Sequence, residues 1–219
     1  ISIGTEGYGS SGTRNITMGY RAMMTEHSLP YNIAIGHTAL HYPGAGGSGY
    51  NIAIGDMSMY GGTAGGAASY NTALGQRTLY SVTAGSYNVA LGHQSLNKVK
   101  TGGQNTALGA YAGYNQIGSH ATLIGYYAGY YATGSSNTFV GSAGFTTGHS
   151  NIAIGYRAAK NTTTGQNNIA IGTDALVSNT TSNSHIALGY RALYNSVNAA
   201  GNQIAIGSSA LFNHSGSAD

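Results

Sequence analysis

Two stretches of the sequence match the glycine pattern G-x-G-x-x-G of dinucleotide-binding sites, at Gly7–Gly12 and Gly44–Gly49. Such a site needs a strand before the glycines and, after them, a helix whose N-terminus faces the pyrophosphate. The second match is followed by "YNIAIG", a short strand pattern, where the helix should begin. Because a chain with 36 glycines produces such matches by chance, we expect no dinucleotide or other cofactor.

The acidic residues are too scattered to indicate a hydrolytic pair. A glycosidase needs two carboxyl groups roughly 5–9 Å apart, and the acids available are Glu6, Glu26, Asp56, Asp174 and Asp219. In the repeat described below, Asp56 and Asp174 would lie seven coils apart, or roughly 34 Å at the usual strand spacing. Glu6 and Glu26 fall in adjacent coils, where solvated surface charge is the simpler interpretation. We expect no enzyme activity, with a polysaccharide-cleaving site between chains as an open alternative.

Metal-binding patterns are equally weak. Calcium-binding solenoid repeats carry an Asp every nine residues, and this chain has only three Asp. Among the eight His, only His37 and His41 are spaced i, i+4, and His37 and His93 occupy the same position in the repeat. With no cysteine, disulfides and thiolate sites are excluded. We therefore predict no metal site.

Tyrosine, with 18 residues, is the type that most favours a binding function. Aromatic faces beside amide and hydroxyl groups suit sugars, because the ring stacks on C–H faces while polar groups fix orientation. The alternative is that tyrosines in equivalent repeat positions stack into ladders that only cover and stabilise the protein. The candidate ligand-binding residues are Tyr42, Tyr60, Tyr80, Tyr126, Tyr127, Tyr130 and Tyr131.

All these residues belong to a repeat that runs through the whole chain. Thirteen glycines, spaced 14 to 20 residues apart and most often 17, close short apolar words such as "NIAIG" and "NTALG". We number each repeat from this Gly as position 0. Position −1 is always Ile, Leu, Val or Met, position −2 is Ala in nine copies, and position −4 is Asn in nine of the twelve copies that reach that far. Residues 1–219 are therefore predicted to form a single repeat domain.

The repeat predicts an all-β parallel solenoid. Large–small–large alternation indicates a strand, and a Gly that can adopt positive φ indicates a corner at its end. The period is too short for helix pairs or propeller blades, so each repeat should be one coil. About thirteen coils ~4.8 Å apart would make a rod of roughly 60 Å. Equivalent residues would then stack, which favours ladders of Asn and of Tyr and disfavours like charges. Tyr31, Tyr50, Tyr70 and Tyr87 should form one such ladder.

The small face of the strand predicts contact with other chains. A coil of this length contributes only three large apolar side chains, so we expect Ile33 and Ile35 in the core and Ala34 facing a neighbour. The alternative is a monomeric roll whose alanines line a tight interior. The residues expected at the oligomer interface are those at position −2: Ala34, Ala53, Ala73, Ala90, Ala107, Leu123, Phe139, Ala153, Ala170, Ala187 and Ala205.

Two zones depart from the pattern. Gly-rich insertions at 41–49 and 60–69 lengthen two coils and should form loops outside the rod, where binding is often found. Around residues 110–145, Leu123 and Phe139 replace the Ala of position −2, while Gly113 and Gly129 replace the apolar residue of position +4. We expect the packing between chains to change in this irregular zone.

The words "HIALGYRALYNSV" (185–197) and "NNIAIGTDALVSNTT" (167–181) resemble the head repeats of trimeric autotransporter adhesins. They resemble even more the N-x-A-[IL]-G-Y-x-A-L arrays of phage tail fibres that end in a cleavable intramolecular chaperone. This resemblance covers the full chain. It implies a homotrimer of left-handed parallel β-rolls, intertwined or side by side, in an extracellular attachment fibre. Handedness and the number three come from the resemblance, not from composition or spacing.

Composition limits the partners. Only 8 Lys+Arg and 5 Asp+Glu are present, with no basic stripe to neutralise phosphates, so we expect no nucleic-acid binding. Apolar runs are too short for membrane insertion. The expected partners are two further copies of the chain and a host cell-surface polysaccharide or outer-membrane receptor. The expected location is a virion tail fibre or a bacterial cell surface, with an adhesin head or a polysaccharide-degrading tailspike as alternatives. The start without Met suggests a segment of a longer protein.

Overall fold

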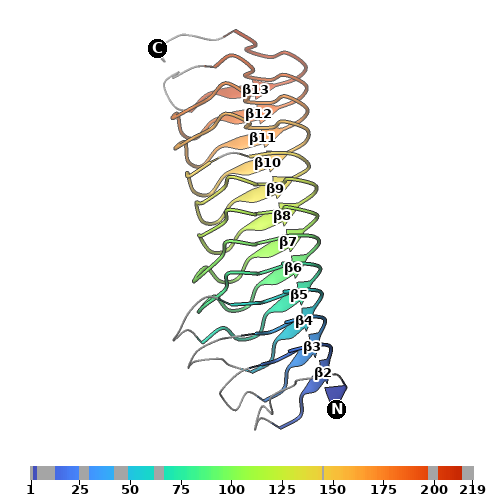
Figure 1. The fold of residues 1–219 in the computed structure, drawn as a ribbon. Helices are drawn as coiled ribbons and strands as arrows, with labels where there is room; N and C mark the ends of the chain where they lie inside the picture. The colour runs from blue at the N-terminus through green and yellow to red at the C-terminus, as the bar shows by residue number, and fades with distance from the viewer. Residues whose placement is uncertain are drawn as a thin grey trace.

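The chain forms a rod of stacked coils (Figure 1). The computed structural model describes residues 2–3, 13–24, 30–41, 49–61, 67–144, 146–196 and 202–213. Thirteen short strands form one parallel sheet whose order follows the sequence. They are β1 (Ser2–Ile3), β2 (Ile16–Met18), β3 (Ile33–Ile35), β4 (Ile52–Ile54), β5 (Thr72–Leu74), β6 (Val89–Leu91), β7 (Thr106–Leu108), β8 (Thr122–Ile124), β9 (Thr138–Val140), β10 (Ile152–Ile154), β11 (Ile169–Ile171), β12 (Ile186–Leu188) and β13 (Ile204–Ile206).

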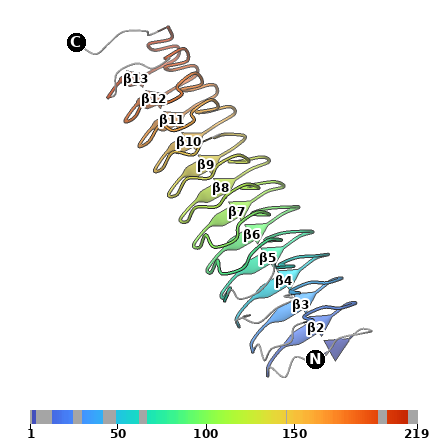
Figure 2. The ribbon, with the colours of Figure 1, turned by 60° about the vertical axis from the view of Figure 1, so that its left-hand side comes forward.

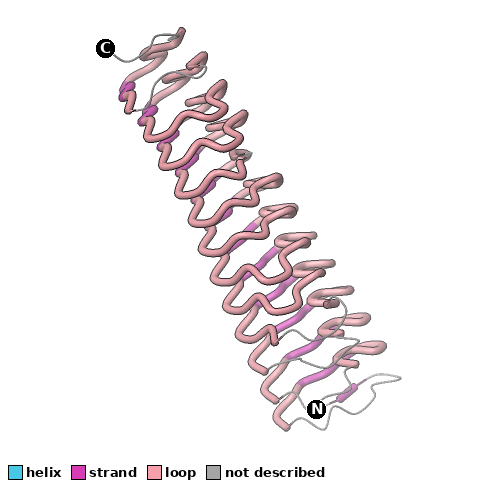
Figure 3. The backbone as a smooth tube through the Cα atoms, turned by 90° about the vertical axis from the view of Figure 1, so that its left-hand side faces the viewer, coloured by secondary structure: helices cyan, strands magenta, loops and turns pink. Residues whose placement is uncertain are grey.

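The strands follow one another along a single side of the rod, and turns and loops form the rest of each coil (Figures 2 and 3). Neighbouring strands pair without slippage, so Ala153 lies beside Ala170 and Ala170 beside Ala187. The described segments contain no helix, and hence none that could cross a membrane. The predicted all-β parallel solenoid is confirmed. The number of complete coils stays a prediction, because several coils include residues outside the described ranges.

The Gly of position 0 is required for two reasons. Gly36 has φ +133°, a conformation that residues with a side chain rarely adopt. A Cβ on Gly36 would also lie 2.5 Å from the carbonyl oxygen of Gly55 in the next coil. The predicted corner is confirmed, and the close stacking of backbones explains why no larger residue replaces this Gly.

The Asn residues of position −4 form the predicted ladder inside the rod. The Oδ1 atom of Asn71 accepts the backbone N–H of Asn88 at 2.9 Å and its side-chain Nδ2–H at 3.1 Å. The same Asn88 Nδ2 also donates to the carbonyl of Gly102 at 3.0 Å. Where Ala121 and His185 replace Asn, their backbone N–H groups still donate to the Asn of the preceding coil. The ladder therefore satisfies buried polar groups that a coil of this width could not otherwise pair.

The predicted inside and outside of the strand are the wrong way round. From β3 to β13 the residues of position −2 are buried within their own chain, each no more than 2% exposed, and so do not face a neighbouring chain. Ile33 and Ile35 instead lie on the outer side of the sheet and are only half-buried. The reason is the width of the coil, because the large residue of position +4 already fills the interior opposite the strand. The residues that were predicted at the oligomer interface but lie in the core are Ala34, Ala53, Ala73, Ala90, Ala107, Leu123, Phe139, Ala153, Ala170, Ala187 and Ala205.

The exchange of small and large residues in the irregular zone at 110–145 lies in this interior. A Cβ on Gly113 would lie 2.5 Å from Leu123 Cδ1, and one on Gly129 would lie 2.8 Å from Leu123 Cδ2 and 2.9 Å from Phe139 Cδ2. Leu123 and Phe139 are fully buried. The two glycines therefore make room for larger residues on the opposite wall, as a close-packed interior requires.

Replacing Asn88 with Ala should lower the free energy of unfolding by about 3 kcal/mol, because Gly102 loses a donor and Asn105 loses its acceptor in a buried site. The midpoint of urea unfolding measures the change. Asn161→Ala is the matched control, since Asn161 is exposed and should change the midpoint little. Equal effects of the two substitutions would contradict a stabilising role for the ladder.

A coupled pair tests the exchange of volume in the core. Gly113→Leu alone should be strongly destabilising, because the new side chain overlaps Leu123 and Leu96. Leu123→Ala alone should cost about 2–5 kcal/mol by opening a cavity. The double variant restores the arrangement of the other coils and should be more stable than Gly113→Leu. Additive losses in urea unfolding would show that the two positions do not share one space.

Candidate functional site

Four tyrosines at position −5 form a continuous stack, as predicted. The ring centroids of Tyr31 and Tyr50 are 4.7 Å apart, those of Tyr50 and Tyr70 4.8 Å, and those of Tyr70 and Tyr87 4.9 Å. The guanidinium carbon of Arg14 lies 5.1 Å from the ring centroid of Tyr31. Because each inner ring covers the faces of its neighbours, this ladder presents ring edges and hydroxyls to solvent.

The predicted ligand-binding residues Tyr60 and Tyr80 belong to a similar stack. Their centroids are 5.2 Å apart, and His41 stacks on the other side of Tyr60 at 5.0 Å. Arg77 lies 6.0 Å from the ring of Tyr80. With their faces occupied, Tyr60 and Tyr80 fit the ladder interpretation better than sugar binding. Tyr42, the third candidate in this part of the chain, lies outside the described residues.

The other four predicted ligand-binding tyrosines come together beside β8. The centroids of Tyr126 and Tyr127 are 4.4 Å apart at an interplanar angle of 66°, and those of Tyr130 and Tyr131 are 4.6 Å apart at 76°. Tyr126 is 65% exposed and Tyr131 is 56% exposed. Two tyrosines that were not among the candidates, Tyr111 and Tyr114, complete this tyrosine cluster.

Ring orientation divides the tyrosine cluster into two groups. Tyr114 and Tyr130 are parallel within 5°, and Tyr127 lies within 22° of Tyr130. Tyr126 and Tyr131 are steeply inclined to these rings and are the most exposed. The stacked rings therefore form a base, and the two inclined rings are the ones available to a ligand.

Two phenols of the tyrosine cluster are harder to ionise than a free tyrosine. A hydrogen bond with the hydroxyl of Tyr126, followed by burial and the neighbouring phenols, raises the pKa of Tyr127. Burial, followed by the nearby phenols of Tyr114, Tyr131 and Tyr111, raises the pKa of Tyr130. Tyr127 and Tyr130 are thus neutral around pH 7 and provide aromatic and hydroxyl contacts, not charge.

The described acids are each paired with other groups. Asp56 Oδ1 is 3.0 Å from His37 Nδ1 and Asp56 Oδ2 accepts from Gln76 Nε2 at 3.1 Å, and these contacts lower the pKa of Asp56, that from Gln76 most. Asp174 lies between two arginines. Neither carboxylate faces the other. Glu6, Glu26 and Asp219 lie outside the described residues. A hydrolytic pair formed by Glu6 and Glu26 therefore stays a hypothesis.

The two histidines that share a repeat position do not meet. His37 stacks on Tyr20 at 5.5 Å, whereas His93 contacts Gln94 and Tyr111. The parts of the chain that the structure describes contain no group of three His, Asp or Glu side chains able to hold a metal ion.

A second group of residues, on the coils of β10 to β12, was not predicted from the sequence. It consists of two tyrosines and two arginines with an aspartate between them: Tyr156, Arg157, Asp174, Tyr190 and Arg191. The available signal was the tetrapeptide Gly-Tyr-Arg-Ala, which occurs at 19–22, 155–158 and 189–192. Its last two copies are two coils apart, so the fold places them on the same side of the rod.

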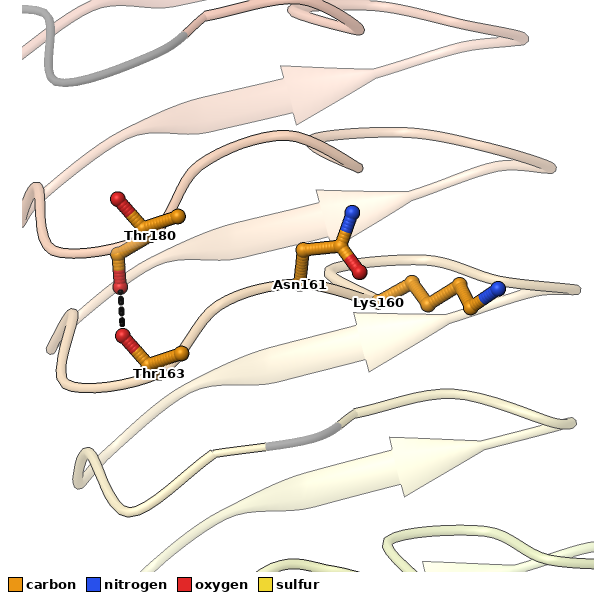
Figure 4. Close-up of a pocket in the computed structure, with 4 residues that line it drawn as sticks. All are labelled: Lys160, Asn161, Thr163 and Thr180. Atoms are coloured by element: carbon orange, nitrogen blue, oxygen red, sulfur yellow. Dashed lines mark hydrogen bonds between the residues drawn. The ribbon is translucent and has the colours of Figure 1, made fainter.

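An open hollow of about 360 Å³ lies nearby, lined by Lys160, Asn161, Thr163 and Thr180 (Figure 4). The Thr163 hydroxyl donates to the carbonyl oxygen of Thr180 at 2.9 Å. Lys160 occupies position +5, where other coils place tyrosine. The hollow thus arises where the aromatic column is interrupted, and it adds a cation to the same coil as Arg157.

Comparison of the chain with family models, with curated proteins and with solved structures gave no match.

Substituting Tyr126 with Phe should lower the pKa of Tyr127, because the hydrogen bond is the largest cause of its elevation. A raised pKa means that folding favours the neutral phenol. This stabilisation is present below the pKa of the unfolded chain and is lost as the pH rises through that of the folded one. Alkaline titration followed by tyrosinate absorbance measures the shift. Tyr87→Phe, in the ladder, is the control, and an unchanged Tyr127 titration in Tyr126→Phe would contradict this origin.

Proposed function

We propose that the chain is a segment of an extracellular, homotrimeric attachment fibre that holds binding groups at a distance and itself contacts surface glycans. A phage tail fibre is the first choice, and the head of a bacterial trimeric adhesin is the second. The trimer and the left-handed roll come from the repeat resemblance. The observation that carries the proposal is an apolar sheet face that no described residue of the chain covers.

This apolar face runs along the whole sheet. Every described residue at position −1 from β2 to β13 is Met, Ile, Leu or Val, and its side chain points away from the core. Met18, Leu91 and Ile171 are 39–43% exposed. Eleven strand intervals at ~4.8 Å make the face roughly 53 Å long. Continuous apolar surfaces of this kind mark interaction sites in soluble proteins.

A partner for this face must present apolar side chains at the same spacing over the same length. Another copy of the chain does so, because its own columns repeat at the strand spacing. Three copies related by a rotation axis along the rod would bury all three faces around that axis. The trimer interface proposed here is thus formed by positions −1 and −3, in place of the alanines of position −2.

Glycan contact is supported by tyrosines whose rings are exposed. Tyr126 and Tyr131 are the most accessible of the predicted ligand-binding residues. A trimer would present three copies of any such site, which raises avidity without raising the affinity of a single site. Against the polysaccharide-degrading alternative, Asp56 and Asp174 are paired with other groups.

Substituting Ile171 with Lys should dissociate the trimer, because an unpaired ammonium group would be buried at the interface. Light scattering after gel filtration of the full chain should give a mass three times 22.2 kDa for the unsubstituted protein and a smaller mass for the variant. Ile117→Lys is the matched control, since Ile117 is 57% exposed and lies outside the strands. The proposed trimer would be contradicted if the unsubstituted chain were monomeric, or if Ile171→Lys and Ile117→Lys changed the mass equally.

Binding of the same full chain to a glycan array tests the adhesive part separately. Signal above that of a heat-unfolded sample is expected. A trimer that binds no glycan would leave a purely structural shaft as the function.

A further inference from the structure

The second and third Gly-Tyr-Arg-Ala copies form a matched pair. Gly155–Ala158 follows β10 and Gly189–Ala192 follows β12, and the coil between them contributes Thr173 and Asp174 at the same positions. Backbone hydrogen bonds set this alignment, from Asp174 N–H to the Tyr156 carbonyl at 2.9 Å and from Arg191 N–H to the Thr173 carbonyl at 3.0 Å. At the usual strand spacing the two copies are ~9.5 Å apart.

Asp174 lies within ion-pair distance of both arginines. Its Oδ1 lies 3.3 Å from Arg157 Nε and its Oδ2 lies 3.8 Å from Arg191 Nε. The aspartate side chain is only 9% exposed, whereas the arginine side chains are 36% and 41% exposed. Both Nε atoms are buried. The exposed part of each arginine therefore lies beyond the atom that faces Asp174.

One carboxylate shared by two guanidinium groups leaves a positive charge at this place. The structure describes every residue from 146 to 196. This range contains three residues with positively charged side chains, Arg157, Lys160 and Arg191, but only one acid, Asp174. Guanidinium groups bind carboxylates through paired N–H donors in a fixed plane. The charge and the geometry favour a carboxylate-bearing ligand.

The tyrosines add flat surfaces at the same spacing. Tyr156 is 60% exposed and Tyr190 is 47% exposed. The guanidinium carbon of Arg191 lies 5.0 Å from the ring centroid of Tyr190 and 5.4 Å from that of Tyr194, which holds it by cation–π contact. Each copy thus offers one aromatic ring beside one arginine.

We propose that Tyr156, Arg157, Tyr190 and Arg191, positioned by Asp174, form a binding site for an acidic polysaccharide whose uronic-acid units contact the two copies in turn. A polymer with repeated units matches a site with repeated groups, and sugar C–H faces stack on tyrosine while carboxylates pair with arginine. The inference rests on the proposed glycan contact and specifies its place and its ligand class.

The first Gly-Tyr-Arg-Ala copy provides an internal control. Arg21 lies 5.1 Å from the ring centroid of Tyr20, as Arg191 does from Tyr190. Two coils further on, however, Asp56 and Met57 occupy the positions that a second copy would fill. Asp56 would repel a carboxylate, so this copy should not bind the polymer.

Polygalacturonate is the probe, and its fully methyl-esterified form is the matched neutral polymer. Titration calorimetry on the full chain should show binding of polygalacturonate about tenfold tighter than that of the ester, because the ester lacks the carboxylates that pair with the arginines. The affinity should fall with added salt. Polyglutamate carries the same charge without sugar rings and should bind more weakly.

The variants locate the site. Arg191→Gln and Tyr156→Ser should each weaken polygalacturonate binding about tenfold, while Arg21→Gln and Tyr20→Ser should leave it unchanged. Asp174→Asn should lower the unfolding temperature without abolishing binding, since it removes the positioning carboxylate but not the cations. Polyglutamate binding as tightly as polygalacturonate, or equal losses in both pairs of variants, would overturn the site.

The outcome is separable from that of the proposed function. If polygalacturonate does not bind but other glycans on the array do, the proposed site is wrong and the adhesive function of the fibre is still supported. An array without any signal would remove glycan contact altogether, and the trimer would still be judged by its mass.

Discussion

Direct stacking of each coil on the next is the constraint on which the rest of the molecule depends. The strands have only two or three residues each, but hydrogen bonds between coils continue around the corners, as from Arg77 N–H to the Asp56 carbonyl and from Leu79 N–H to that of Ser95. The described corners are therefore in register with the coil above, as the strands are. Gly at position 0 is compatible with this close stacking because it has no Cβ. Asn at position −4 is compatible with it because its side chain hydrogen-bonds to the equivalent residue of the next coil.

The stacking also determines what kind of surface the protein can present. A residue type that recurs in the repeat becomes a continuous column, as the apolar residues of position −1 and the tyrosines of position −5 do. A residue type that changes from coil to coil becomes a local feature. Charges follow the second rule, because like charges in one column would repel, and Asp174 accordingly lies between Arg157 and Arg191. Recognition of a specific ligand is consequently expected where a column is interrupted.

Much of the fold could be predicted because a repeat reports the same local rule many times. The positions of the strands, the Gly corner, the Asn ladder and the Tyr31 to Tyr87 stack all followed from thirteen aligned copies. The candidate site was predicted less well. Tyr126 and Tyr131 proved exposed, but Tyr60 and Tyr80 were stacked, since ring orientation depends on the neighbours in adjacent coils. The Gly-Tyr-Arg-Ala pair was missed because its two copies are 34 residues apart in the sequence. Only the coil length shows that this separation places them on the same side of the rod.

Alternation along the strand established that position −2 and positions −1 and −3 face opposite ways, because successive side chains of a strand always do so. It could not establish which way is inward. That choice was made by the corners, where Arg77 and Leu79 adopt positive φ and turn the large residue of position +4 into the coil. With Leu79 inside, only Ala73 fits opposite, and Leu74 is left on the surface. Local periodicity thus determines the two faces of a strand, while the width of the closed coil decides which face becomes the core.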